Sequence, residues 1–154
     1  MQIIKHRTVV EDTWRHIPDF EALPDTGNIT VSLTRWHNDR TTLDGYTGQI
    51  GLRLQTSDID GALDAVTARD WPLIEIYFPA FTDGRGFSLA RMIRHHAAYQ
   101  GELRAGGYFL RDQLGYLARV GFDAFAPEID WGGPLENALD AFAEIAVSYQ
   151  TSYC

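Results

Sequence analysis

The sequence has almost no cysteine, since its only thiol belongs to Cys154. One cysteine cannot form an internal disulfide, a Cys-x-x-Cys redox pair or the four-thiolate ligand set of an iron–sulfur cluster. We therefore expect no iron–sulfur cluster and no thiol-based redox centre held by this chain alone. A thiol at the end of a chain is most often an inert passenger.

Long apolar runs and basic runs are also missing. No apolar segment approaches the roughly 18–20 residues that span a membrane, and the net charge is −8. No basic run offers the face that a phosphate backbone needs. The first 14 residues alternate apolar and charged side chains, unlike a secretory signal. We expect a cytoplasmic globular protein that inserts into no membrane and binds no nucleic acid.

Although the net charge is negative, arginine residues are concentrated in one part of the sequence. Nearly half of the 13 basic residues lie between positions 85 and 119. Such a stretch can form a positive patch that binds a small anion. Its members are Arg85, Arg91, Arg94, Arg104, Arg111 and Arg119.

A repeating pattern of apolar strand, polar turn and helical stretch runs along most of the chain. Strands separated by about 20–28 residues are typical of strand–helix–strand crossovers. We predict one α/β domain over residues 1–154, with about five mainly parallel strands alternating with helices. Residues 1–28 form a short N-terminal β ribbon and a loop, and residues 29–150 form the β/α repeats. The predicted strands are 29–33, 49–54, 73–78, 101–105 and 122–125.

Two arrangements of these strands remain open. We favour an open doubly wound sheet, because five strands are too few to close a standard eight-stranded barrel. The alternative is a half-barrel-like (β/α) arrangement, since residues 101–125 look like the strand–Gly-Gly–helix–strand unit of phosphate-binding barrels. Apolar periodicity predicts a helix that ends at Gly121 and a final helix from Leu135 to Tyr149. An open sheet leaves exposed edges, which favours a homodimer.

Functional sites of parallel α/β folds lie beyond the carboxyl ends of strands. This rule selects PAFTDGR (79–85) and GGY (106–108). In the first segment, Asp83-Gly84 suits a turn and Gly86 permits close backbone approach. The segment therefore reads as a specialised connection between a strand and a helix.

An anion at the start of that helix would meet free N–H groups and Arg85, and Ser88 is a candidate cap. Arg85, Gly86 and Ser88 are therefore predicted to bind an anion, together with Arg104. The alternative is that Asp83 and Arg85 only stabilise the turn by capping and ion pairing. For the second segment, the predicted anion-binding residues are Gly106, Gly107, Arg111 and Asp112.

Two charged residues lie inside predicted strands. Glu75 and Arg104 each interrupt an apolar segment, and a charge in a central strand costs several kcal/mol unless it is paired. They form either a buried structural ion pair or a polar cluster beneath a site. The candidate catalytic residues are Asp83 or Glu75 as acid and base, with Arg85 and Arg104 as electrostatic clamps.

Other familiar sites are not supported. Gly84-Arg85-Gly86 departs from the dinucleotide fingerprint, because position 89 is Leu and Glu102 begins a strand instead of ending one. His95 and His96 are adjacent on a helix and point about 100° apart, which does not suit a metal site. We predict no NAD site and no metal site, and no cofactor is identified.

Two long motifs resemble the DUF934 family of bacterial proteins of unknown function. They are FPAFTDGRGFSLAR (78–91) and GELRAGGYFLRDQLGYLARVGFDAF (101–125), and SYQ at 148–150 is also similar. The sequence departs from the family pattern at Tyr108, Phe109 and Val120, so a thiol at position 120 is lacking. The residues that match the family motifs are Asp83, Gly84, Arg85, Gly86, Ser88, Glu102, Arg104, Asp112, Gln113 and Asp123.

The resemblance implies a link to sulfite reduction, since members are often described as oxidoreductases involved in it. The first hypothesis is an accessory protein of assimilatory sulfite reduction that assists sulfite reductase and holds a small oxyanion near Arg85 and Arg104. The second is a small enzyme acting on an anionic substrate. The third is a non-catalytic scaffold or interaction protein in which every motif residue serves the fold.

Overall fold

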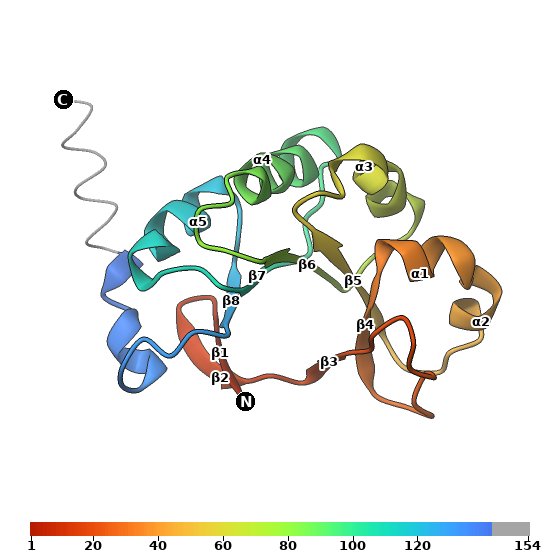
Figure 1. Ribbon diagram of the computed structural model, residues 1–154, viewed down its shortest axis with the longest axis horizontal. Coiled ribbons are helices and arrows are strands. Elements are labelled where there is room, and N and C mark those ends of the chain that lie inside the picture. The colour runs from red at the N-terminus through yellow and green to blue at the C-terminus, as the bar shows by residue number, and fades with distance from the viewer. Residues whose placement is uncertain (143–154) are drawn as a thin grey trace.

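The computed structural model describes residues 1–142 and shows one eight-stranded sheet with helices packed against it (Figure 1). The strands are β1 (Gln2–Lys5), β2 (Thr8–Glu11), β3 (Trp14–His16), β4 (Asn28–Ser32), β5 (Ile50–Gln55), β6 (Leu73–Phe78), β7 (Glu102–Gly107) and β8 (Ala124–Pro127). The α-helices are α1 (Leu33–Asn38), α2 (Arg40–Asp44), α3 (Ile59–Ala68), α4 (Arg85–Arg91) and α5 (Leu114–Val120). A π-helical turn forms η1 (Met92–His96), and 3₁₀ turns form η2 (Arg111–Gln113) and η3 (Leu135–Ala138).

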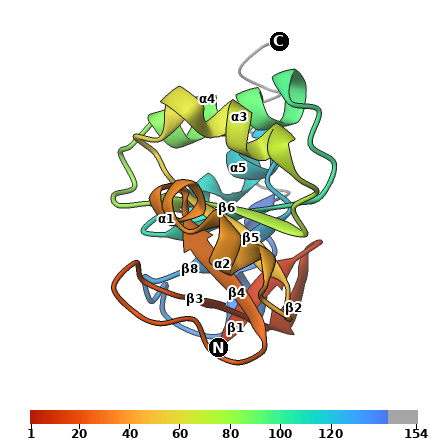
Figure 2. The ribbon, with the colours of Figure 1, turned by 90° about the vertical axis from the view of Figure 1, so that its right-hand side faces the viewer.

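The sheet curls into a half-barrel with its helices on the convex side (Figures 1 and 2). The strand order is β2-β1-β8-β7-β6-β5-β4-β3. Strands β3 to β8 are parallel, and β1 is antiparallel to β2 and β8. The predicted doubly wound sheet is therefore wrong, and the half-barrel alternative is the arrangement observed. The reason is that β4 to β8 follow one another without a reversal of order, so right-handed crossovers place their helices on one face.

The five predicted strands correspond to β4–β8, with boundaries that agree within two residues. The predicted N-terminal ribbon is the β1–β2 hairpin, and α5 ends at Gly121 as expected. Strand β3 was not predicted, because it is only Trp14–His16 and pairs with β4 alone. The predicted final helix begins as the 3₁₀ turn η3, and residues 143–149 of that prediction lie outside the described residues.

Alternation along the strands separates an apolar face from a polar one. On β6, Ile74, Ile76 and Phe78 are buried on the helix side, and the Phe78 ring lies 5.7 Å from the ring of Phe87 on α4. The intervening side chain of Glu75 faces the concave side of the sheet. Adjacent side chains of a strand point to opposite faces. The main core therefore lies beneath the helices, and polar groups remain on the concave side, which we call the lumen.

A short segment joins the two ends of the curled sheet. The terminal strands β2 and β3 are consecutive in the chain, and only Asp12 and Thr13 connect them. The backbone from Glu11 to Trp14 spans at most about 11 Å, so the two ends must lie close together. We call residues 11–16 the strap (Figure 1). Because the strap joins the two terminal strands, the sheet must be curled. The homodimer that we inferred from open sheet edges stays a prediction.

Within residues 1–142, no helix has the length and apolar character needed to cross a bilayer.

Candidate functional site

The lumen contains a polar cavity of about 200 Å³ between the strap and the sheet. Strands β4 to β8 form one wall, and the strap forms the other. The titratable and charged side chains that line it come from six separate elements or connections. They are Asp12, His16, Arg53, Glu75, Arg104 and Glu128.

Three of these charges form a row across neighbouring strands. Arg53 on β5 is in register with Glu75 on β6, which is in register with Arg104 on β7. The Arg53 Nε lies 2.5 Å from Glu75 Oε1, and Glu75 is 3% exposed. Burial raises the pKa of Glu75, although Arg53 and Arg104 oppose this effect. A buried carboxyl with a raised pKa is the type of group that serves as acid or base near neutral pH.

Arg104 is fixed by carboxylates on two sides. Its Nη1 donates to Asp12 Oδ1 at 3.0 Å and its Nη2 donates to Glu102 Oε2 at 3.2 Å, while Lys5 lies 2.8 Å from Glu102. The Nε of Arg104 is buried and has no hydrogen-bond partner within residues 1–142. An unsatisfied buried donor costs about 1–3 kcal/mol. Arg104 therefore holds one N–H that a ligand oxygen could satisfy.

Tyr77 contacts two of the side chains that line the cavity. The Tyr77 hydroxyl donates to Glu128 Oε2 at 2.7 Å, and the Arg53 guanidinium lies 4.8 Å from the Tyr77 ring centroid. Burial and the Glu128 carboxylate raise the pKa of Tyr77 to about 12. Tyr77 therefore keeps its proton at neutral pH and orients both of its neighbours.

His16 on β3 also lines the cavity. Its Nδ1 lies 3.0 Å from the Thr30 hydroxyl oxygen. Burial, followed by the positive charge of Arg53, lowers the pKa of His16 to about 4. The imidazole is therefore uncharged near neutral pH, so the two arginines are the only cations among the lining side chains named above.

Gly106 makes room for the carboxyl group at the centre of the row. A Cβ at this position would lie 2.7 Å from Glu75 Oε2. The missing side chain lets the Glu75 carboxyl lie directly against β7. The next residue, Gly107, ends β7 with a φ of 94°.

The predicted corner at Asp83 and Arg85 is a turn in which the two side chains pair with each other. Arg85 Nη2 lies 2.9 Å from Asp83 Oδ2, and the Thr56 hydroxyl donates to the same oxygen at 2.5 Å. These contacts hold the pKa of Asp83 far below its usual range. Helix α4 begins at Arg85 after an N-cap at Gly84, so the predicted cap at Ser88 is wrong and that residue lies inside the helix.

Gly86 has a packing reason for its lack of a side chain. A Cβ there would lie 2.2 Å from the ring of Phe78. The glycine lets α4 pack closely on the end of β6. Together with the Asp83–Arg85 pair, this contact accounts for the special residues of the segment without a ligand.

The two connections selected from the sequence lie side by side, but their arginines do not converge. Tyr108 N donates to Phe78 O at 2.9 Å, and Gln113 Nε2 donates to Phe81 O at 3.0 Å. Arg85 pairs with Asp83 at the corner, and Arg104 points into the lumen. The structure therefore brings Glu75 and Arg104 together and leaves Arg85 apart from them.

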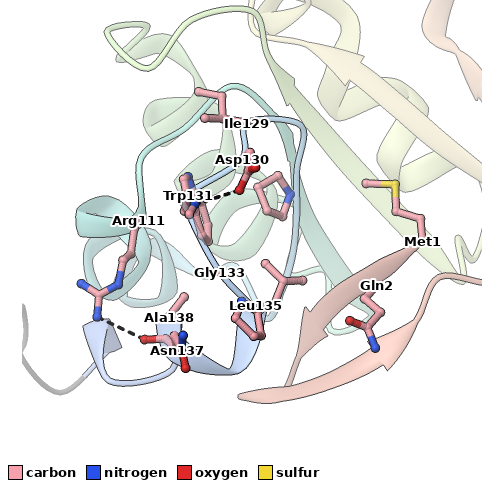
Figure 3. A pocket seen from close by; sticks show the side chains of 13 residues that line it. Met1, Gln2, Arg111, Ile129, Asp130, Trp131, Gly133, Leu135, Asn137 and Ala138 are labelled. Carbon is pink, nitrogen blue, oxygen red and sulfur yellow. Dashed lines mark hydrogen bonds between the residues drawn. The ribbon is translucent and has the colours of Figure 1, made fainter.

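Arg111 lines a second cavity, of about 310 Å³, beside the end of β8 (Figure 3). Its Nη2 donates to Asn137 O at 3.3 Å, and the exposed Asp112 lies 3.6 Å from its Nη1. Pro127 and Ile129 line this second cavity, whereas the residues between and before them line the lumen. The end of β8 thus separates the two cavities.

Sequence reasoning missed four of the six titratable or charged lumen residues, namely Asp12, His16, Arg53 and Glu128. Arg53 interrupts a predicted strand in the same way as Glu75 does, so the same test would have found it. Asp12 and His16 come from the strap, where no periodicity or motif marks them. Within the described part of the chain, no group of three or more His, Cys, Asp and Glu side chains is placed to hold a metal ion.

A family model described as "Bacterial protein of unknown function (DUF934)" matches residues 51–154. The chain belongs to the DUF934 family. No curated protein and no solved structure matches it. In this DUF934 protein, the lumen residues Arg53, Glu75 and Arg104 lie inside the matched range. The strap lies before residue 51 and therefore outside that range.

Proposed function

We propose that this DUF934 protein is an accessory protein of assimilatory sulfite reduction that binds a small oxyanion in the lumen and assists sulfite reductase. The family resemblance supports the link to sulfite. The oxyanion part rests on one observation, namely that Arg53 and Arg104 converge on a single cavity from strands on either side of Glu75. Guanidinium groups are the side chains best suited to bind oxyanions.

Arg104 supplies the vacant donor for such a ligand. Its two Nη groups are engaged by Asp12 and Glu102, and its Nε has no partner within the described residues. This Nε is shielded from solvent, so a ligand reaches it only after a neighbouring side chain shifts.

A second candidate function is that of a small enzyme acting on an anionic substrate. The raised pKa of Glu75, together with its place between two guanidinium groups, favours this reading. Glu75 would exchange a proton with the substrate while Arg53 and Arg104 stabilise its negative charge. Asp83 is less suited to this role, because its low pKa keeps it ionised and Arg85 already pairs with it.

Anion binding is tested by calorimetric titration of the purified protein with sulfite. We expect binding by the native protein, a loss of at least about tenfold in affinity for Arg53→Gln, and unchanged affinity for Arg85→Gln. The two variants remove the same charge, one inside the lumen and one at the exposed corner. Equal losses of sulfite affinity in both variants would contradict a lumen site. Absence of sulfite binding by the native protein would contradict the oxyanion proposal and favour the hypothesis of a non-catalytic scaffold.

The link to sulfite reduction is tested in the source bacterium. Deletion of the gene is expected to impair growth on sulfate and to spare growth on cysteine. Restoring the native gene should restore growth, and restoring Arg53→Gln should not. Equal growth of the deletion strain on both sulfur sources would overturn this part of the proposal.

A further inference from the structure

The lumen offers a ligand more carboxylates than cationic side chains. The charged side chains that line it are those of Asp12, Glu75 and Glu128 and the guanidinium groups of Arg53 and Arg104. Met1 also lines the cavity, and its ammonium group pairs with Glu11 at 3.4 Å. Ionised carboxylates only accept hydrogen bonds. An oxyanion in this cavity is therefore attracted by the arginines and repelled by the acceptors between them, unless it brings a donor of its own.

Two carboxylate oxygens have capacity for a further hydrogen bond. Asp12 Oδ1 accepts from Trp14 N and Arg104 Nη1, both at 3.0 Å, and Glu75 Oε1 accepts from Arg53. Within residues 1–142, no hydrogen bond engages Asp12 Oδ2 or Glu75 Oε2. The cavity thus combines a vacant donor, Arg104 Nε, with vacant acceptors.

We infer that the lumen selects oxyanions that carry a proton, such as hydrogen sulfite, hydrogen phosphate or hydrogen carbonate, over fully ionised sulfate. This inference rests on the proposed oxyanion site and names its ligand class. The anionic oxygens accept from the guanidinium groups, and the O–H donates to a lumen carboxylate. A proton on the ligand converts a repulsive contact into a charge-assisted hydrogen bond.

Asp12 is the residue that sets this selectivity. Its ion pair with Arg104 places an ionised carboxylate at the cavity wall, where it can accept from the ligand. Glu75, whose Oε1 accepts from Arg53 and whose carboxyl lines the cavity, is the second acceptor when it is ionised. Sulfate has no proton near neutral pH, so its oxygens can only accept hydrogen bonds. The oxygens of sulfate would therefore repel the carboxylate oxygens of Asp12 and Glu75. Discrimination of this kind arises from the unfavourable contact with the wrong ligand.

The experiment compares inorganic phosphate, sulfite and sulfate as probes of the full-length protein, by calorimetry at matched ionic strength and slightly below neutral pH. We expect phosphate and sulfite to bind at least about tenfold more tightly than sulfate. Sulfite affinity should fall as the pH rises, because its protonated form disappears. These measurements on the native protein do not depend on any variant folding.

Asp12→Asn supplies the specific test of the selecting residue. An amide can donate to an unprotonated oxygen, so this variant should narrow the preference for phosphate over sulfate to within about threefold. Asp112→Asn makes the same charge change on a side chain that is 87% exposed and outside the lumen, and it should keep the native preference.

The outcomes separate this inference from the proposed function. If sulfate binds as tightly as phosphate and sulfite, the selection of protonated oxyanions is overturned while oxyanion binding stands. If none of the three probes binds, the oxyanion site itself is overturned and this inference with it. A folded Asp12→Asn variant that keeps the full preference would overturn the role of Asp12.

Discussion

Glu75 and Arg104 occupy paired positions on the neighbouring parallel strands β6 and β7, and each is only 3% exposed. Arg53 flanks Glu75 on the other side, so charges of alternating sign cross three strands at one level. Glu75 is paired with Arg53, and Arg104 is paired with Asp12 and Glu102. Removal of one member therefore leaves its neighbours without compensation in a poorly solvated place.

The two arginines highlighted by the sequence should differ sharply in their effect on stability. Arg104→Met leaves Asp12 without its ion-pair partner and Glu102 with Lys5 alone, so we expect a loss of about 3–5 kcal/mol in the free energy of unfolding. Arg85→Gln breaks an ion pair whose arginine is 61% exposed, so we expect a much smaller loss, because solvent screens such a pair. Urea denaturation measures both changes. Similar losses in the two variants would contradict the assigned burial of Arg104.

Gly106→Ala should disturb the site through Glu75. The new Cβ would lie 2.7 Å from Glu75 Oε2, so the carboxyl must shift away from β7 and its contact with Arg53 must change, and we expect a destabilisation of roughly 1–3 kcal/mol together with weaker oxyanion binding. Gly84→Ala is the matched control, because a Cβ there has no neighbour within 4 Å and φ is −69°. It should be neutral or stabilise by about 0.5 kcal/mol. Unchanged binding in Gly106→Ala would argue against the position of Glu75.

His16 should make the protein less stable in mild acid. Its pKa falls from 6.5 to about 4 on folding, so the unfolded chain binds the additional proton between these values. Stability should therefore decrease as the pH falls through this window, by at most about 1.4 kcal/mol per pH unit from this group. Urea denaturation of the native protein and His16→Gln at several pH values measures this effect. The variant should lose part of the pH dependence, and identical slopes would show that His16 titrates normally.

Asp83 should contribute stability at neutral pH that disappears in strong acid. Its pKa is lowered on folding from 3.8 by Arg85 and Thr56, so the contribution is complete above that value and declines as the pH falls below it. We expect Asp83→Asn to lose about 1 kcal/mol at neutral pH, since Arg85 is largely solvated. The difference from the native protein should shrink below pH 3.8. A constant difference across this range would mean that the Asp83 carboxylate is not held ionised by its partners.

Alternation and spacing were sufficient to predict strands β4–β8, because each is a short apolar segment within a strand–helix–strand unit. They could not distinguish a doubly wound sheet from a half-barrel. Each unit is locally the same in both arrangements, and only the direction in which successive strands are added differs. That direction is a property of the whole sheet, and no residue within one unit determines it.

The same limit applies to the site. Glu75 and Arg104 were found because a charge inside an apolar strand is conspicuous, and adjacency of the strands followed from their order. Asp12 was not found, because its contact with Arg104 joins residues 92 positions apart. The strap has no periodicity that reveals which face it covers. Gly86 was read as a ligand-binding glycine, whereas its contact with Phe78 is a matter of packing that only the folded chain reveals.

The pairing of β1 with β8, in which Ile4 lies opposite Phe125, has a consequence for biosynthesis. A nascent chain leaves the ribosome with its N-terminal hairpin first, and that hairpin has no neighbouring strand until β8 has emerged. Pairing between such distant segments is a slow step in folding. The β1–β2 hairpin is thus expected to stay undocked from the rest of the sheet until β8 has been synthesised.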